Sequence, residues 1–436
     1  MKNVLIVSYF YPPCNIVASE RPKSFAENFK QHGLNTTVVT RHWDGNESGK
    51  AADFERINTT PPKITELESY TLIQLPYFAK GRGLYRAFQR NRLLSRFISL
   101  IYTMFGNFSS QMNAEKAFYD YLRDYLKHNK VDYLMVISSP LNIVKLGHLL
   151  AEEFDFSLIV DFRDLWDNGL LATDYKPGLE TKVKNFFYEF HLKRWLKNAA
   201  LITSVSEPLL EQIRRISPNA ETTVVMNGFE NDLLEKRSKS SNRANPKFTF
   251  SVIGTLYPWQ DLSVLIEGLN LFLKDKSLNE IQLNFIGTGV FQEVETLLET
   301  SLPQECTLIT NRIPHAQAVQ KAVESHVLFY AGWKGYRGIV SGKIFEYLGA
   351  GKNILIAPSD NDIIARIVSE TDAGKVADSP QEFAQILNQW FNEWKTRGDL
   401  AYKGKLEKIK FYSRENQAGL FAKEMKKITK TETISA

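Results

Sequence analysis

Residues 4–40 read VLIVSYFYPPCNIVASERPKSFAENFKQHGLNTTVVT, and this stretch decides the fold. It begins with the apolar run 4–7, continues through a helical pattern over 21–31, and ends in the β-branched run 37–40. A strand, a helix and a second strand in this order are typical of a parallel sheet covered by helices. The sequence therefore predicts an α/β protein.

The same alternation continues to the end of the chain and is interrupted once. Residues 235–247, EKRSKSSNRANPK, are polar and charged, as expected of a solvated linker. A chain of 436 residues also exceeds the size at which one core keeps growing. We predict two Rossmann-like, doubly wound parallel-sheet domains facing a central cleft, at 1–234 and 248–410, followed by a C-terminal helix and basic tail at 411–436.

Composition narrows the class of protein. With 43% hydrophobic, 24% charged and 12% aromatic residues, the chain is neither collagen-like nor disordered. Two cysteines, Cys14 and Cys306, exclude a disulfide framework and a cysteine-based zinc site. The first apolar run ends at Pro12 and Pro13, and no run of about 18 apolar residues follows. We therefore expect a cytoplasmic protein without a signal peptide or a transmembrane helix.

Positive charge is concentrated in residues 80–105, KGRGLYRAFQRNRLLSRFISLIYTMF, where basic side chains are interleaved with large apolar ones and no acid occurs. Such a mixture suits a helix lying in an anionic membrane interface, so we expect peripheral association with the inner leaflet of the cell membrane. A core helix with a solvated basic rim is the alternative. Nucleic acid is not expected as a partner, because the apolar residues outnumber the basic ones.

The pattern that most strongly indicates chemistry is the Gly-rich stretch 338–352, GIVSGKIFEYLGAGK. A Gly-rich loop that leads into a helix presents free N–H groups and the positive end of the helix dipole, which suit a phosphate. Lys343 adds a cation, and Glu346 is placed to accept hydrogen bonds from a ribose. A solvated helix with an incidental acid and base is the alternative. The candidate donor-binding residues are Gly254, Thr255, Arg337, Gly338, Val340, Ser341, Gly342, Lys343 and Glu346.

A second candidate site follows the predicted strand at 158–161. Ligands of open α/β sheets bind beyond the carboxyl ends of strands, where Arg163 and Asp164 are expected. Asp164 could receive a proton from an acceptor hydroxyl, and Arg163 could hold it or a diphosphate; with Lys343 they are the candidate catalytic residues. An Asp–Arg pair that fixes a corner is the alternative. The candidate acceptor-binding residues are Pro13, Glu20, Arg21 and Ser139, with a helix-start role as the alternative for Glu20.

Residues 342–357, GKIFEYLGAGKNILIA, resemble the donor-binding segment of glycosyltransferase family 4 (glycosyl transferase group 1), which has the GT-B fold. Residues 7–40, 136–167 and 248–269 continue the resemblance over nearly the whole chain. It implies retaining transfer of a sugar from a UDP- or GDP-sugar to a hydroxyl of a glycan or lipid-linked acceptor, in cell-envelope polysaccharide or glycan synthesis. The C-terminal half would bind the donor and the N-terminal half the acceptor, with no metal and no cofactor beyond the donor.

The chain departs from that family in three places. Ile339 stands where members commonly carry a second Glu, and 254–260 lack the Arg and Lys usual after the first strand of this half. Residues 14–19 replace a glycine pair in the first loop. Arg337 could supply part of the missing charge. Two other functions therefore stay open: a sugar-nucleotide epimerase or phosphorylase, and a catalytically lapsed binding partner in a polysaccharide assembly complex.

Overall fold

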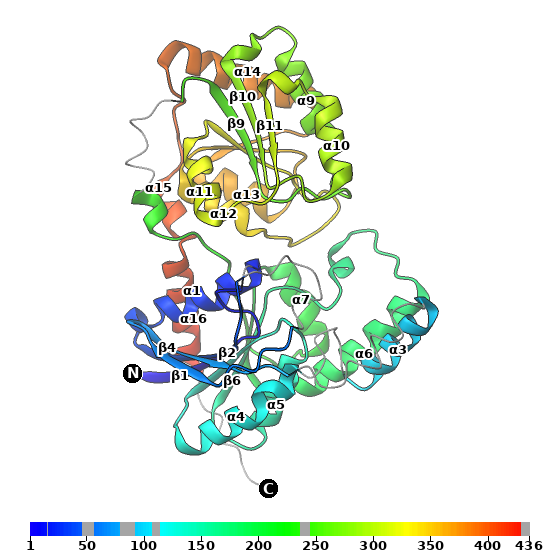
Figure 1. Cartoon of the computed structure of the whole chain (residues 1–436), viewed down its shortest axis with the longest axis vertical. Helices are drawn as coiled ribbons and strands as arrows, with labels where there is room; N and C mark the ends of the chain where they lie inside the picture. Colours follow the sequence, from blue (N-terminus) through cyan, green and yellow to red (C-terminus); the bar gives the residue numbers. More distant parts are fainter. Residues whose placement is uncertain (15, 46–55, 79–91, 107–113, 236–244, 429–436) are drawn as a thin grey trace. The chain divides into compact units, whose positions relative to one another are not determined.

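The computed structural model describes residues 1–14, 16–45, 56–78, 92–106, 114–235 and 245–428. The chain forms two compact units. The N-terminal unit comprises Met1–Leu171, Tyr175–Met226 and Gln417–Ala436, and the C-terminal unit comprises Ala172–Asp174 and Asn227–Asn416. Each unit is a sheet flanked by helices (Figure 1), so the predicted α/β class with two doubly wound units is confirmed.

The sheet of the N-terminal unit is parallel except for its first edge strand, which runs antiparallel to its neighbour. The central strand pairs with the second strand of the chain on one side and with the fifth on the other. The winding of the chain therefore changes direction beside it, and open α/β sheets bind ligands at such a switch point. In spatial order the strands are β3 (Lys63–Glu66), β4 (Tyr70–Leu75), β2 (Leu34–Arg41), β1 (Lys2–Val7), β5 (Tyr133–Ile137), β6 (Ser157–Phe162), β7 (Ala199–Ser204) and β8 (Thr222–Val224).

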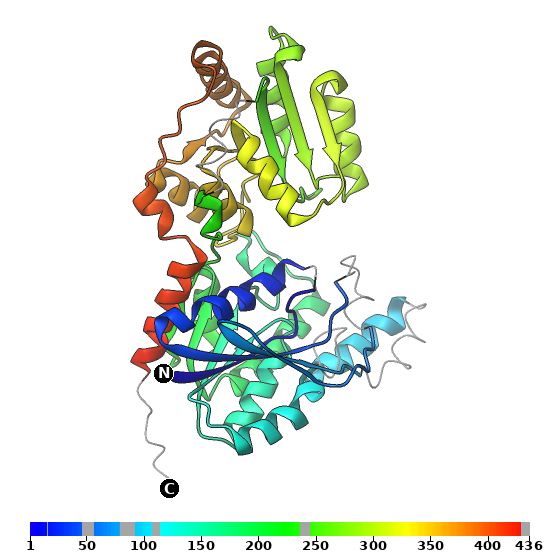
Figure 2. The ribbon, with the colours of Figure 1, turned by 60° about the vertical axis from the view of Figure 1, so that its left-hand side comes forward.

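The helices of this unit cover both faces of the sheet and include one from the end of the chain (Figure 1). That last helix packs on the first, since the Phe25 and Phe421 rings lie 5.1 Å apart. Figures 1 and 2 both show the two helices side by side. The helices are α1 (Glu20–Asn28), α3 (Arg92–Met104), α4 (Ala114–His128), α5 (Ile143–Ala151), α6 (Leu179–Trp195), α7 (Glu207–Ile216) and α16 (Arg414–Lys427), of which Gln417 onward belongs to this unit.

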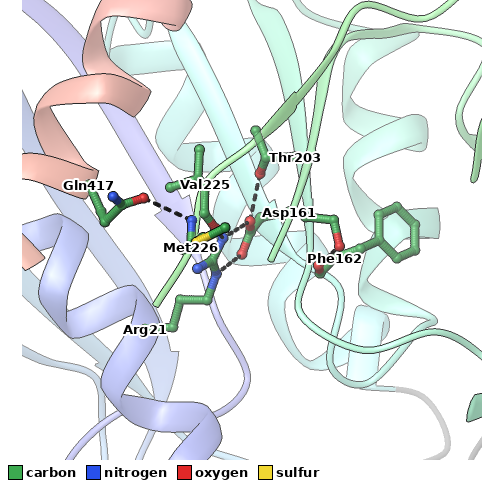
Figure 3. A network of polar contacts seen from close by, with 8 residues as sticks. Arg21, Asp161, Phe162, Thr203, Val225, Met226 and Gln417 are labelled. Atoms are coloured by element: carbon green, nitrogen blue, oxygen red, sulfur yellow. Dashed lines mark hydrogen bonds and ion pairs between the residues drawn. The ribbon is translucent and has the colours of Figure 1, made fainter. Parts of the chain in front are cut away.

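A buried ion pair joins α1 to the sheet (Figure 3). The Arg21 Nε and Nη2 atoms donate to the two carboxylate oxygens of Asp161 at 2.8 and 2.7 Å. Arg21 Nη2 also donates to the Val225 carbonyl at 2.8 Å, and the Thr203 hydroxyl donates to Asp161 at 2.5 Å. Both charged side chains are buried, so their mutual hydrogen bonds replace those that water would provide.

The sheet of the C-terminal unit is parallel throughout. Its strand order places the first strand of the unit between the second and the fourth, which gives a second switch point. In spatial order the strands are β11 (Thr307–Thr310), β10 (Ile281–Ile286), β9 (Phe248–Ile253), β12 (Val327–Tyr330), β13 (Asn353–Ile356) and β14 (Gly374–Val376).

The helices of the C-terminal unit enclose a core rich in phenylalanine. One close helix contact lies at Gly268, where an added Cβ would lie 2.5 Å from the Phe383 ring. The helices are α9 (Ser263–Leu273), α10 (Gln292–Ser301), α11 (His315–Glu324), α12 (Gly342–Ala350), α13 (Ile363–Thr371), α14 (Pro380–Arg397) and α15 (Leu406–Lys410).

The basic segment lies partly outside the described residues. Lys80, Arg82, Arg86 and Arg90 belong to 79–91, and the end of the basic tail belongs to 429–436. Arg96 is described and lies exposed on α3. In the part of the chain that the structure describes, no helix has both the length and the apolar character needed to cross a membrane.

We expect Asp161→Ala to lower the free energy of unfolding of the N-terminal unit by about 3–5 kcal/mol, because it leaves the Arg21 charge buried without its carboxylate. Urea unfolding followed by tryptophan fluorescence measures this change. The double variant Arg21→Met with Asp161→Leu should recover most of the loss. Glu153→Ala, which breaks an exposed pair with Arg123, is the control and should change little. Equal effects at Asp161 and Glu153 would contradict the role given to the buried pair.

Candidate functional site

The first part of the candidate donor site is the turn after β9. Gly254 has a φ of +85°, and its N–H donates to the Ile286 carbonyl at 2.7 Å. A Cβ at this position would lie 2.7 Å from Lys343 Cε. Both the left-handed backbone and the close approach of the lysine stem therefore require glycine here.

Lys343 supplies the positive charge of the site. Its ammonium group donates to the Thr255 carbonyl at 2.6 Å, and it forms no ion pair with a carboxylate of the described residues. Burial lowers the pKa of Lys343 to about 8, while the negative charge of Glu346 acts in the opposite direction. Because its partner is a neutral carbonyl, no carboxylate cancels the positive charge of the protonated lysine.

The amino-terminal end of α12 is partly exposed and has open space at Gly342. Ser341 caps the helix, and its hydroxyl accepts from the Lys343 N–H at 3.4 Å. A Cβ added to Gly342 would meet no atom within 4 Å. The Gly342 N–H has no hydrogen-bond partner among the described residues, and with the positive end of the helix dipole it lies at the helix start next to Lys343, an arrangement that binds anions.

A buried tyrosine fixes this helix end against the sheet. The Ile253 N–H donates to the Tyr347 hydroxyl oxygen at 3.0 Å, and the hydroxyl lies 3.3 Å from the Ile253 carbonyl. Because Ile253 precedes Gly254 directly, the turn after β9 and the start of α12 are held together by one side chain.

The acidic run 360–362 holds the Gly-rich loop ahead of α12 in place. The Gly338 N–H donates to Asp362 at 2.5 Å, with Gly338 in the left-handed region at a φ of +78°. Asp360 accepts from two N–H groups in the first turn of α13 at 2.9 and 3.0 Å, so this acidic run begins a helix. Val340 is buried, whereas the side chain of Arg337 is exposed in the same loop.

Glu346 contacts a residue that is not among the candidates from the sequence. His315 Nε2 lies 2.9 Å from a carboxylate oxygen of Glu346. His315 is the first residue of α11, which follows the carboxyl end of β11, so it lies on the same edge of the sheet. The sequence signal that could have identified His315 is its position after a predicted strand, because polar residues there lie at the ligand-binding edge of open sheets.

The candidate residues of the N-terminal unit follow three strands of its sheet. Pro13 lies exposed in the loop after β1, and Ser139 lies half-buried just after β5. Arg163 and Asp164 follow β6 directly, with Arg163 Nε 3.6 Å from Asp164 Oδ2. Asp164 is 52% exposed and is therefore accessible to a ligand. These residues share the carboxyl edge of the sheet, as expected.

Arg21 and Glu20 begin α1 but have different surroundings. Glu20 is half-buried at the first position of the helix. Arg21 is 5% exposed and points inward to Asp161, as the network in Figure 3 shows. The guanidinium thus has a structural role, and its contact with an acceptor stays a prediction that this orientation does not favour.

Metal ligation has no support in the described part of the chain, where no group of three or more His, Cys, Asp or Glu side chains is arranged to hold an ion. The sequence-based expectation of a metal-free site stays a prediction.

Comparison with known proteins gives matches among structures alone. No family model and no curated protein sequence matches the chain. Sucrose-phosphate synthase from Thermosynechococcus elongatus superposes with a TM-score of 0.62 at 13% identity, over 98% of each chain. The UDP-forming α,α-trehalose-phosphate synthase of Burkholderia vietnamiensis gives 0.58 at 11%, over 98% of this chain and 100% of that one. Anabaena HepE in complex with UDP gives 0.56 at 11%, with the same coverage. At these identities the likeness establishes the fold, and the chain has the GT-B architecture of these proteins.

Proposed function

We propose that this protein is a glycosyltransferase that moves a sugar from a nucleoside diphosphate sugar to an acceptor hydroxyl. The observation that carries the proposal is the Lys343 ammonium beside the open start of α12, at the switch point of a parallel sheet. The fold is shared with sucrose-phosphate synthase, with a UDP-forming synthase and with a protein bound to UDP. A UDP-sugar or a GDP-sugar is the donor in this proposal.

Lys343 provides the charge that family 4 members are expected to carry after β9. No Arg or Lys occurs in 254–260, but the Lys343 ammonium reaches the Thr255 carbonyl from α12. In the reaction, the bond between the sugar and the diphosphate breaks and negative charge develops on the leaving oxygen. Lys343 and the Gly342 N–H stabilise that charge, and their fixed positions minimise reorganisation during the step.

Glu346 binds the ribose of the donor in this proposal. A carboxylate accepts hydrogen bonds from both hydroxyls of a vicinal diol, and His315 holds one of its oxygens in place at 2.9 Å. His315 is therefore a positioning residue. In this proposal Arg337, whose side chain is exposed just ahead of Gly338, contacts the outer part of the donor.

The acceptor binds the N-terminal unit in this proposal. Asp164 takes the proton of the attacking hydroxyl, and Arg163 holds the carboxylate at 3.6 Å. Pro13, Glu20 and Ser139 supply the surrounding surface. We further propose that transfer proceeds with retention and without a metal, on a glycan or lipid-linked acceptor of the cell envelope.

A panel of nucleotides tests the donor site. We expect UDP, GDP or one of their sugars to stabilise the protein, by about 2.7 kcal/mol at a hundredfold excess over its dissociation constant. Glu346→Ala should weaken that ligand about tenfold to a hundredfold, because it removes charge-assisted hydrogen bonds. Thermal shift and calorimetry measure both effects, with ADP and CMP in the panel.

Glu299→Ala, on the exposed face of α10, is the matched control and should bind like the wild type. Failure of every nucleotide to bind would overturn the proposed function. Binding without turnover over a panel of acceptors would favour a binding partner, and an epimer or sugar phosphate formed without acceptor would favour the epimerase or phosphorylase.

The affinity for the nucleoside diphosphate should depend on pH through Lys343. The free protein loses the Lys343 proton as the pH rises through its pKa of about 8, whereas a bound diphosphate keeps it protonated. Affinity should be nearly constant from pH 7 to about 8 and then fall by about tenfold per pH unit.

Calorimetry in two buffers of different ionisation enthalpy should show uptake of about half a proton per binding event near pH 8. Lys343→Met should bind weakly at all pH values without this uptake. Lys321→Met, at an exposed lysine of α11, is the control. An affinity that stays constant to pH 9.5 would contradict this role of Lys343.

Gly254→Ala should weaken nucleotide binding about tenfold or more, because the added Cβ displaces the Lys343 stem from a position 2.7 Å away. It should also cost about 1 kcal/mol of stability through its positive φ. Gly398→Ala is a matched control, since Gly398 has a φ of +75° and open space at its Cβ. It should lose similar stability and keep its affinity; equal affinity of the two variants would refute the prediction.

A further inference from the structure

Two helices of the N-terminal unit present large apolar side chains to solvent. On α3 these are Phe97, Ile101 and Met104, which follow one face of the helix at intervals of three and four residues. On α6 they are Leu179, Phe186 and Phe190, again at helical spacing. Phe97 and Phe190 are each 60% exposed and Phe186 is 64% exposed. We call these six residues the α3–α6 apolar face.

The two helices form one surface because they pack on each other. His191 Nε2 of α6 lies 2.9 Å from the Met104 carbonyl at the end of α3. Near the other end of α6, Arg96 Nε lies 3.7 Å from Glu180. A Cβ added to Gly106 would lie 3.1 Å from the Trp195 ring, so the chain after α3 also lies close to α6. Figure 1 shows the two helices side by side.

The charge around this face is positive. Helices α3 and α6 together contain six basic and two acidic residues. Glu180 is engaged by Lys184 at 2.8 Å as well as by Arg96, and Glu189 is half-buried. Exposed Lys182 and Lys193 stand one helical turn from Phe186 and Phe190.

This combination distinguishes between the possible occupants. A second copy of the chain would place basic side chains against basic side chains, which costs free energy. Nucleic acid would satisfy the lysines but leave the phenylalanine rings in water. An anionic lipid bilayer offers an apolar region for the rings and negative headgroups for the lysines, whose stems can extend along the interface.

We propose that the α3–α6 apolar face docks the protein on an anionic lipid bilayer, with both helices lying in the interface. The inference goes beyond the proposed glycosyl transfer and does not depend on it. It also extends the basic segment at 80–105, because α6 supplies half of the apolar face from a part of the sequence about 80 residues later.

Sedimentation with vesicles tests the proposal on the full chain. Vesicles of phosphatidylcholine with a minority of phosphatidylglycerol should bind at least tenfold more tightly than phosphatidylcholine alone, and added salt should weaken the binding. Phe97→Glu and Phe186→Glu should each lower the affinity about tenfold or more. Lys182→Glu with Lys193→Glu should reduce mainly the preference for the anionic lipid.

Leu271→Glu is the matched control, because Leu271 is an exposed leucine on a helix of the C-terminal unit. It should bind vesicles like the wild type. Thermal unfolding identifies variants that do not fold, and Phe97→Ser and Phe186→Ser then replace the glutamate variants. The same effect from Leu271→Glu as from Phe97→Glu would overturn the proposal.

A dye whose emission depends on its surroundings tests directly whether the α3–α6 apolar face enters the bilayer. Attached at Phe186→Cys it should shift to the blue when anionic vesicles are added, and at Leu271→Cys it should not. Both native cysteines are buried and should label slowly. No shift at Phe186→Cys would overturn the proposal, as would unchanged vesicle binding of the Phe97 and Phe186 variants. A stable dimer that Phe97→Glu dissociates would assign the face to a second copy instead.

Discussion

The buried ion pair between Arg21 and Asp161 is the constraint on which the N-terminal unit depends. It connects α1 to β6, and through Thr203 and the Val225 carbonyl it reaches β7 and the chain after β8. Gln417 of α16 accepts from the Met226 N–H, one residue beyond Val225, so the last helix joins the same network (Figure 3). Removing either charged partner leaves the other charge buried without compensation. Once such a pair is present, neither residue can therefore be replaced alone without a large loss of stability. The strand that holds Asp161 leads directly into Arg163 and Asp164.

Arg21 and Lys343 show how the hydrogen-bond partner of a cation determines its role. Arg21 faces a carboxylate and a carbonyl and is enclosed by the fold. Lys343 donates to a carbonyl at the edge of an open helix end, and burial lowers its pKa to about 8. The first arrangement neutralises the charge and fixes the chain. The second leaves positive charge available, at some cost in stability, as is common where proteins bind anions.

The C-terminal unit holds its candidate site by local constraints. Tyr347 connects α12 to the end of β9, Gly254 allows the lysine stem to approach, and Asp362 holds the Gly-rich loop at Gly338. These contacts fix the positions of 254–260 and of the Gly-rich loop relative to α12. The Lys343 ammonium reaches the Thr255 carbonyl, in the turn after β9, from α12.

The sequence by itself determined the α/β class, the two parallel sheets and the Gly-rich start of α12, because strand runs, helical spacing and turn residues are local patterns. It did not indicate β3 and β4, which pair with each other at one edge of the first sheet. It also did not indicate to which unit α16 belongs. It assigned Arg21 to a ligand and did not place His315 among the candidate residues. Only the tertiary structure decided these points: Asp161 lies 140 residues from Arg21 and Glu346 lies 31 from His315. Which side chains meet over such separations depends on how the sheet and its helices pack, and no local pattern encodes that packing.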